Sequence, residues 1–399
     1  MQSTTQAAEA TTHTQPLAEP KEGASQASQP GRLVSLDVFR GLTVMAMILV
    51  NNPGSWGHIY APLEHAEWNG CTPTDLIFPF FLFIVGVSVV YALSGIKARG
   101  GPLGPTIGRV LRRGAVLFAL GLFMALFPKF EFGTVRILGV LQRIGLVFGA
   151  CGVLFLTTSR RTQLWLIAGI LVGYHLLLLI PAPGQAEALL LPGKDIGAWL
   201  DRTVLSEAHL WKQSRTWDPE GLLGTLPAIA TGLLGVVAGQ WLRRPDVAPA
   251  EKVVWLFIDG GALLVLGMIW NSWLPVNKSL WTSSYVLYTG GYAICSLALL
   301  YWLCDVQQWR RWIQPALWYG VNAITVFFLS GIIARSLGLL KTTDAAGQTV
   351  SWKDYLYHSF FTPVFTDPRN ASLAGALTCV LIWLVVLGLM YRRRIIIKV

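Results

Sequence analysis

The segment EHAEWNGCTPTDLIFPFF brings together residue types that can carry acid–base chemistry. His65 lies in its polar first half, and Asp75 falls in the first turn of the apolar helix that follows. A carboxylate beside an imidazole fixes the ring tautomer and raises its basicity, as a general base requires. Helix-dipole stabilisation would explain Asp75 without any catalytic role, and a loop histidine is commonly a bystander. The surrounding His, Trp, Asn and Asp residues favour a functional site.

Other polar and aromatic residues lie at the ends of apolar segments, in EHAEWNGCTPTDLIFPFF, WDPEGLLGT and PVNKSLWTSSY. The distribution of Lys and Arg predicts that these ends are all on the same side of a membrane. Their positions predict a substrate pocket open to that side, although each residue alone could be a helix cap or a packing residue. The candidates for substrate binding are Trp68, Asn69, Asp218, Glu220, Asn277 and Trp281.

Arginines at the opposite ends of the apolar segments, together with Arg143 inside one of the segments, are candidates for phosphate binding, because guanidinium groups bind phosphate oxygens well. The alternative is that they only meet lipid headgroups. Arg40 could equally form a structural ion pair with Asp37, three residues earlier on the same helix face. The candidates are Arg40, Arg112, Arg113, Arg143 and Arg243.

The composition specifies the kind of protein that must position these groups. Of 399 residues, 53% are hydrophobic and only 13% are charged, about half the charged share of an average soluble domain. A soluble globular surface, a disordered chain and a disulfide-stapled scaffold are excluded. The 17 Trp and 40 Gly fit an integral membrane protein, in which Trp collects at the interfaces and Gly is common in the spans.

Apolar segments near the ~20 residues that a spanning helix needs recur along the chain. Because the backbone must satisfy its own hydrogen bonds in lipid, they are predicted to be helices, which gives an all-α polytopic bundle. Residues 1–31 are polar, without the pattern of a signal peptide, and are predicted to be a disordered cytoplasmic tail. The ten predicted spans are 36–52, 74–95, 107–127, 138–157, 163–180, 221–242, 252–270, 281–303, 315–335 and 371–391.

Lys and Arg concentrate in alternate connections, whereas residues 53–73 contain neither. By the positive-inside rule, both termini are predicted to be cytoplasmic. The net charge of +10 therefore reflects topology, and no nucleic-acid partner is predicted. The sequence has no P-loop, no GxSxG and no HExxH, and its five cysteines show neither metal-ligand nor CxxC spacing, so no metal is expected.

SLDVFRGLTVMAMILVNN and HAEWNGCTPTDLIFPFFLFIVG, with RILGVLQRIG, WDPEGLLGT and PVNKSLWTSSYVLYTGG, resemble the heparan-α-glucosaminide N-acetyltransferase family. The similarity runs in order over residues 32–395. The chain resembles a bacterial member that lacks the large lumenal domain of the animal enzyme, with residues 32–399 as the transmembrane acetyltransferase domain. In this resemblance His65 matches the essential family histidine, Asn51 the asparagine that closes the first helix, and Asp75 the aspartate of the second.

The resemblance implies transfer of acetyl from cytoplasmic acetyl-CoA to the amine of a glucosamine-type sugar across a bacterial inner membrane. The inner arginines would then hold the ADP end of CoA. His65 could act as general base or accept the acetyl group itself. A transporter of amino sugars or N-acetylated sugars and an O-acylating enzyme are the alternatives. The natural acceptor and a homodimer are left open.

Overall fold

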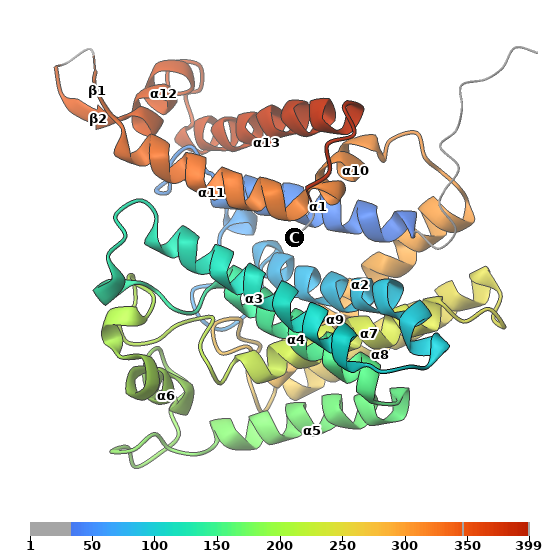
Figure 1. The fold of residues 1–399 in the computed structure, drawn as a ribbon. Helices are drawn as coiled ribbons and strands as arrows, with labels where there is room; N and C mark the ends of the chain where they lie inside the picture. The colour runs from blue at the N-terminus through green and yellow to red at the C-terminus, as the bar shows by residue number, and fades with distance from the viewer. Residues whose placement is uncertain (1–32, 345–346, 398–399) are drawn as a thin grey trace, which may run out of the picture. The chain divides into compact units, whose positions relative to one another are not determined.

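A computed structural model describes residues 33–344 and 347–397, which form a helical bundle with one short β-hairpin (Figure 1). The predicted all-α membrane fold is confirmed, and the predicted tail over residues 1–31 lies outside the described residues. The long helices are α1 (Val34–Asn51), α2 (Ile77–Arg99), α3 (Gly104–Leu126), α4 (Val140–Thr157), α5 (Arg160–Leu178), α7 (Thr225–Leu242), α8 (Pro249–Trp270), α9 (Ser283–Tyr301), α11 (Ala323–Leu339) and α13 (Pro368–Arg392).

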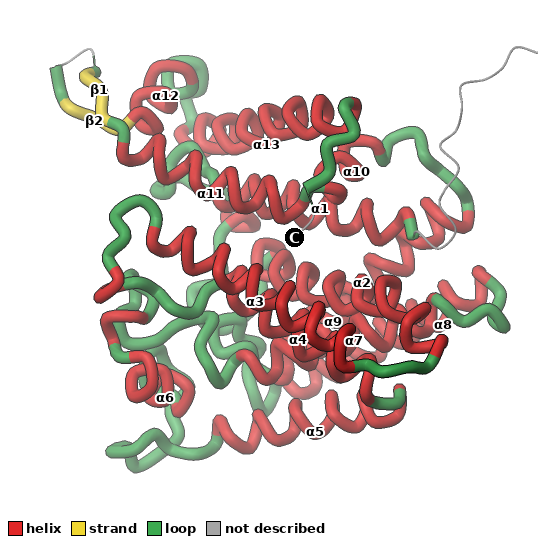
Figure 2. The backbone as a smooth tube through the Cα atoms, viewed as in Figure 1, coloured by secondary structure: helices red, strands yellow, loops and turns green. Residues whose placement is uncertain are grey.

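Short elements fill the connections between these helices (Figure 2). A 3-10 helix precedes α2, and a π-helical turn extends α9. The short elements are α6 (Ile196–Leu205), α10 (Gln314–Val321), α12 (Trp352–Phe360), the 3-10 helices Ala61–Leu63, Pro73–Leu76, Phe132–Thr134 and Glu207–His209, the π-helix Trp302–Val306, and the antiparallel strands β1 (Lys341–Thr343) and β2 (Thr349–Ser351).

Side-chain caps explain where several helices begin. Ser159 accepts a hydrogen bond from the Thr162 backbone N–H at the start of α5, and Asp195 accepts one from Ala198 at the start of α6. Asp367 caps α13, and proline occupies the first turn of that helix. Each cap satisfies a backbone donor that the first helical turn leaves without a partner.

Helices occur at all ten predicted spans, but two of them differ from the others. In the part of the chain that the structure describes, eight helices are long and apolar enough to cross a membrane. The predicted single span 315–335 is instead the pair α10 and α11, bent by 78° at Asn322, which would make a ninth span if the pair is counted as one. The remaining predicted span, 107–127, corresponds to α3, which has 23 residues but carries Arg109, Arg112 and Arg113. That α3 crosses the membrane therefore stays a prediction, as does the orientation of the termini.

The long helices form two groups (Figure 1), and each group has a hydrophobic core of buried side chains. In the first, α2 packs against α7, α3 against α4, and α8 against α9. In the second, α1 packs with α10, α11 and α13 around Val44, Ile48, Tyr319 and Leu387. The groups meet mainly where α1 contacts α2 and α9.

Glycine allows the helices of the first group to approach closely. A Cβ on Gly86 of α2 would lie 1.9 Å from the carbonyl oxygen of Gly232, and one on Gly235 of α7 would lie 2.0 Å from that of Phe83. Small residues at such contacts let helix backbones approach in a bilayer, where dispersion rather than the hydrophobic effect drives association.

The bend at Asn322 is stabilised by the segment that follows α13. The Asn322 side chain donates to the carbonyl of Ile395 at 3.1 Å and accepts from the N–H of Ile397 at 3.0 Å. Figure 2 shows the loop after α13 running back past α10 towards α11. Residues at the end of the chain thus supply polar partners at the point where the span is broken.

We expect Gly86→Ala to destabilise the protein, because the new methyl group would overlap a backbone oxygen of α7. Overpacking of this kind costs about 1–3 kcal/mol. The matched control is Gly95→Ala on the same helix, where a Cβ meets no atom within 4 Å. Thermal unfolding in detergent should show a lower midpoint for Gly86→Ala alone, and equal midpoints for the two variants would contradict the close approach of α2 and α7.

Candidate active site

Asp75 is fixed by the turn that starts the second predicted span. In the segment CTPTD, Thr72 caps the 3-10 helix Pro73–Leu76 and Pro73 begins it. The Asp75 carboxylate closes the capping box by accepting the Thr72 N–H at 3.1 Å, and the same oxygen accepts the Ala66 N–H at 3.0 Å. The carboxylate is fully buried, so these bonds replace the water that it would otherwise bind.

His65 contacts the other oxygen of this carboxylate. Its Nδ1 lies 2.7 Å from Asp75 Oδ1, and 56% of its side chain remains exposed. An ionised carboxylate is only an acceptor, so we assign the ring proton to Nδ1, which leaves the lone pair of Nε2 available. The structure thus brings His65 and Asp75 into contact, as the sequence predicted.

Lys278 joins this pair from the loop between α8 and α9. Its Nζ lies 2.9 Å from Nδ1 and 3.3 Å from Nε2 of His65, and 3.3 Å from Asp75 Oδ1. Burial lowers the pKa of the Lys278 ammonium, while the charge of Asp75 opposes that shift. In the sequence, Lys278 stands out only as one of the polar residues of PVNKSLWTSSY at the outer end of a predicted span, and the candidates for substrate binding predicted there were Asn277 and Trp281.

A cavity of about 490 Å³ opens beside His65. Its walls come from α1, α2, α4 and α11, so it lies between the two hydrophobic cores. Asn51 at the end of α1 lines it together with His65, Asp75 and Lys278. Deeper in the bundle the lining is apolar and includes Phe81 and Phe327. The cavity therefore combines a polar end with an apolar interior, as a small-molecule site requires.

Three tryptophans form one side of the polar end. Trp68 and Trp217 meet edge to face with ring centroids 5.1 Å apart, and Trp211 lies 5.5 Å from Trp217. All three line the cavity, and the Trp68 indole is fixed by donating to the carbonyl of Leu190 at 2.7 Å. Only Trp68 was selected from the sequence. Trp211 and Trp217 lie in a long predicted loop, where interfacial anchoring explains tryptophan equally well.

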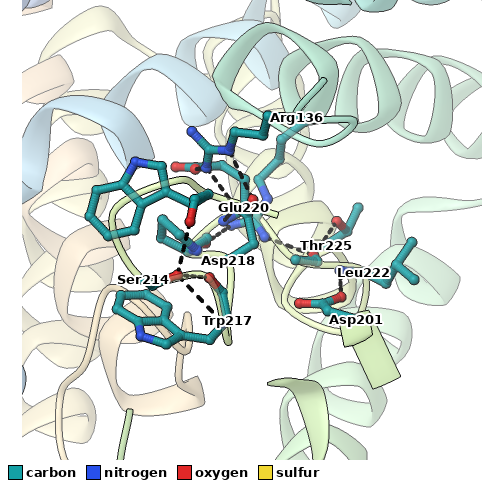
Figure 3. A network of polar contacts seen from close by, with 12 residues as sticks. Arg136, Asp201, Ser214, Trp217, Asp218, Glu220, Leu222 and Thr225 are labelled. Carbon is teal, nitrogen blue, oxygen red and sulfur yellow. Dashed lines mark hydrogen bonds and ion pairs between the residues drawn. The ribbon is translucent and has the colours of Figure 1, made fainter. Parts of the chain in front are cut away.

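An ion-pair network holds the next wall (Figure 3). Arg136 donates to both oxygens of Asp218, at 2.8 and 2.6 Å, and also contacts Glu220. Although burial lowers the pKa of Arg136, the two carboxylates raise it above its usual value. Arg136 and Glu220 line the cavity, whereas Asp218 is buried behind them. The Glu220 side chain thus lies on the cavity wall, and Asp218 positions Arg136.

Asp201 supports this wall from α6. Its Oδ1 accepts the Leu222 N–H at 2.8 Å and so holds the loop that carries Glu220 (Figure 3). Burial raises the pKa of Asp201 to about 7, and the nearby carboxylates Asp218 and Asp195 act in the same direction. The loop is therefore held by a group that titrates near neutral pH.

The remaining predicted substrate-binding residues lie outside the cavity lining. Asn277 is buried, and its amide donates to the Asn69 side chain at 3.1 Å and accepts the Leu280 N–H at 2.8 Å. Trp281 is 1% exposed and donates to Thr231 in the core. Asn69 and Asn277 thus join two loops near the site, and Trp281 packs below it.

The five predicted CoA-binding arginines are not brought together. Arg40 bonds Asp37 at 3.0 Å and Ser88 at 2.9 Å, and so connects α1 with α2. Arg143 is buried and donates to the carbonyls of Pro219 and Gly221 at 3.1 and 3.0 Å, so it supports the Glu220 loop. Arg112 and Arg113 are exposed on α3, and Arg243 is exposed just after α7. The Arg113 guanidinium lies over the Phe148 ring, and that of Arg243 lies over the Tyr91 ring.

Other reactive groups near the cavity do not suit nucleophilic chemistry. Burial raises the pKa of the Cys71 thiol to about 12, and the Asp75 charge adds to this, so the thiol carries little thiolate at neutral pH. Over residues 33–344 and 347–397, His, Cys, Asp and Glu side chains form no group that could hold a metal ion. Within this region His65 is the cavity-lining nitrogen base that a carboxylate orients.

The fold and the site together define a polytopic membrane protein with an Asp–His pair at the polar end of a cavity between its helices. The family described as heparan-alpha-glucosaminide N-acetyltransferase, catalytic, matches residues 32–255, a range that contains both residues of the pair. The chain belongs to this family, as the sequence motifs indicated.

Two relatives carry the name heparan-alpha-glucosaminide N-acetyltransferase. The human protein is 32% identical over 354 residues, which cover 75% of this chain and 52% of the relative. The mouse protein is 29% identical over 367 residues, or 78% of this chain and 55% of the relative. The chain thus matches about half the length of these relatives.

We expect Asp201 to make stability depend on pH. Because its pKa is raised in the folded state, folding takes up a proton between about pH 4 and pH 7, and stability falls as pH rises through this window. Asp201→Asn cannot ionise but can still accept from Leu222. Its unfolding midpoint should therefore fall less between about pH 5 and pH 8 than that of the wild type.

Thermal unfolding across that pH range checks the expectation, with Glu187→Gln as an exposed control in the preceding loop. The control should follow the wild-type slope. A slope for Asp201→Asn that equals the wild-type slope would show that Asp201 does not titrate in this window.

Proposed function

We propose that this protein transfers an acetyl group from cytoplasmic acetyl-CoA to the amine of a glucosamine-type sugar on the other side of a bacterial inner membrane. The observation that carries the proposal is the 2.7 Å contact between His65 and the buried Asp75 at the polar end of the cavity. The family membership and the names of the relatives support the same chemistry.

Acetyl transfer to an amine needs a base close to the nucleophile. An ammonium has no lone pair, so the amine must lose its proton before or during attack on the thioester carbonyl. His65 can accept that proton at Nε2, because Asp75 holds the Nδ1 proton and the ring orientation. The C–S bond then breaks, the amide forms, and CoA leaves as a thiol after protonation.

A covalent route uses the same geometry. Nε2 of His65 attacks the thioester, CoA leaves, and the acetylimidazole then passes its acetyl group to the sugar amine. The two routes differ in one measurable respect. Radiolabelled acetyl should accumulate on the protein when acceptor is withheld in the covalent route, and should not in the direct route.

The polar end of the cavity suits a cationic sugar. The faces of Trp68, Trp211 and Trp217 offer apolar surface to a sugar ring, and Glu67 and Glu220 place carboxylates on the same cavity for its ammonium group. Asn51, at the end of α1, lines the same cavity, and we propose that its amide hydrogen-bonds the acetyl carbonyl or a sugar hydroxyl.

The donor would enter from the opposite side. We propose that the apolar part of the cavity between α1, α2, α4 and α11 takes the pantetheine arm. The exposed arginines Arg112, Arg113 and Arg243 are then the candidates for the phosphates, whereas the internal bonds of Arg40 and Arg143 favour structural roles.

We expect His65→Ala to lower acetyl transfer at least about 100-fold, the low end of what a positioned base contributes. Purified protein, radiolabelled acetyl-CoA and a panel of amino sugars provide the measurement. His358→Ala is the matched control, since His358 is exposed on α12 and does not line the cavity. An active His65→Ala protein would contradict the site, and sugar flux without acetyl-CoA consumption would favour a transporter.

Trp68→Ala should raise KM for the amino sugar and leave KM for acetyl-CoA unchanged, because the indole borders only the polar end of the cavity. Loss of one aromatic contact of about 0.5–1.5 kcal/mol predicts about a 2- to 10-fold increase. The control is Trp56→Ala, in the same loop but 64% exposed. Steady-state kinetics with each substrate varied would disprove the assignment if both KM values rose together.

A further inference from the structure

Lys278 is held in place by the loop that carries it. In residues 275–282, Thr282 Oγ1 donates to the carbonyl of Pro275 at 2.9 Å, and Asn277 Oδ1 accepts the Leu280 N–H at 2.8 Å. The Gly70 N–H donates to the carbonyl of Val276 at 2.7 Å, which joins this loop to the His65 loop. The Lys278 side chain is 20% exposed, so its position follows from the fold.

The approach of Lys278 to the imidazole is not that of a linear hydrogen bond. Its Nζ is 2.9 Å from Nδ1 and 3.3 Å from Nε2, whereas a donor in line with one ring nitrogen would lie much farther from the other. The lone pair of Nε2 thus stays clear of a directed bond from Lys278. The ammonium acts on the ring through its charge.

The effect of the Lys278 charge on His65 depends on the Asp75 carboxylate that both residues contact. A fully buried carboxylate requires a positive partner. With His65 as its sole partner, the carboxylate would favour the imidazolium, which cannot accept a proton. The Lys278 Nζ lies 3.3 Å from Asp75 Oδ1 and is thus a second group that can offset the charge of this carboxylate.

Two carboxylates act on the Lys278 ammonium. Burial lowers its pKa and is the largest effect, and the charges of Asp75 and Glu220 oppose that shift. Arg136, the nearest cation of the neighbouring wall, is paired with Asp218 and Glu220. Lys278 is thus the cation that the geometry assigns to Asp75.

We propose that Lys278 is a positioning residue that balances the charge of Asp75, so that His65 stays a neutral base. This inference rests on the proposed function and deepens it. It also explains why one carboxylate contacts both a lysine and a histidine. Lys278 lies beyond residues 32–255, so the family match does not assign it.

The test compares variants that keep or remove the charge. Lys278→Gln can still hydrogen-bond Asp75 but has no charge, and Lys278→Met removes both features. In both, we expect kcat to fall about 10-fold or more with KM for acetyl-CoA nearly unchanged, and the acid limb of the pH–rate profile to move to higher pH. Lys278→Arg should keep the limb in place and recover part of the rate.

A second measurement does not depend on acetyl transfer. Diethyl pyrocarbonate modifies neutral imidazole, so its rate of reaction with His65, read by peptide mass spectrometry, reports that form across pH. The pH dependence should move upward in Lys278→Gln and Lys278→Met and stay in place in Lys278→Arg. The folded fraction is isolated by size exclusion, and two different neutral variants guard against misfolding of either.

The outcomes separate this inference from the proposed function. If wild-type protein acetylates an amino sugar while neither the rate profile nor the modification profile moves in the neutral variants, the charge-balancing role is overturned. If Lys278→Arg loses as much activity as Lys278→Gln, with unmoved profiles in both, Lys278 is only structural. If wild-type protein transfers acetyl to no amino sugar, the proposed function fails, whatever the modification data show.

Discussion

The burial of the Asp75 carboxylate is the constraint around which the site is organised. A charge without contact to water needs several donors, and here they come from parts of the chain that are far apart. The N–H groups of Ala66 and Thr72 hold one oxygen, while His65 and Lys278 meet the other. The hydroxyl of Tyr285 on α9 donates to the backbone carbonyl of Asp75 at 2.6 Å. Satisfying one carboxylate thus brings the His65 loop, the start of α2 and the loop before α9 together, and the Tyr285 bond joins α9 to the same residue.

The cavity follows from the arrangement of the helices around this point. Close glycine contacts hold α2 against α7 and α3 against α4 in the larger group of helices. The second group, built on α1, α11 and α13, has its own core. Space remains between these cores, and the loop that carries Glu220 closes it on one side through Arg136 and Arg143. Polar groups therefore concentrate at the end of the cavity where loops, rather than helices, form the walls.

Local features of the sequence predicted much of this arrangement. A run of apolar residues is enough to place a membrane helix, and helices occur at all ten positions. His65 and Asp75 are ten residues apart, and the turn between them is capped by its own threonine, so their contact was predictable. Lys278 is 213 residues from His65, and no periodicity reports a contact at that distance. The bend at Asn322 and the burial of Trp281 were missed for the same reason, because average hydropathy does not show which neighbour a residue meets.

The hydrogen bonds at Asn322 affect the order in which the bundle can assemble. The amide that marks the bend between α10 and α11 finds its partners in Ile395 and Ile397, which are synthesised after α13. Until those residues leave the ribosome, the broken span carries polar groups that lipid cannot satisfy. The bend that sets the α11 wall of the cavity is therefore completed only after α13 has been synthesised, so a nascent chain arrested before Ile395 would contain the Asp75–His65 pair beside an incomplete cavity wall.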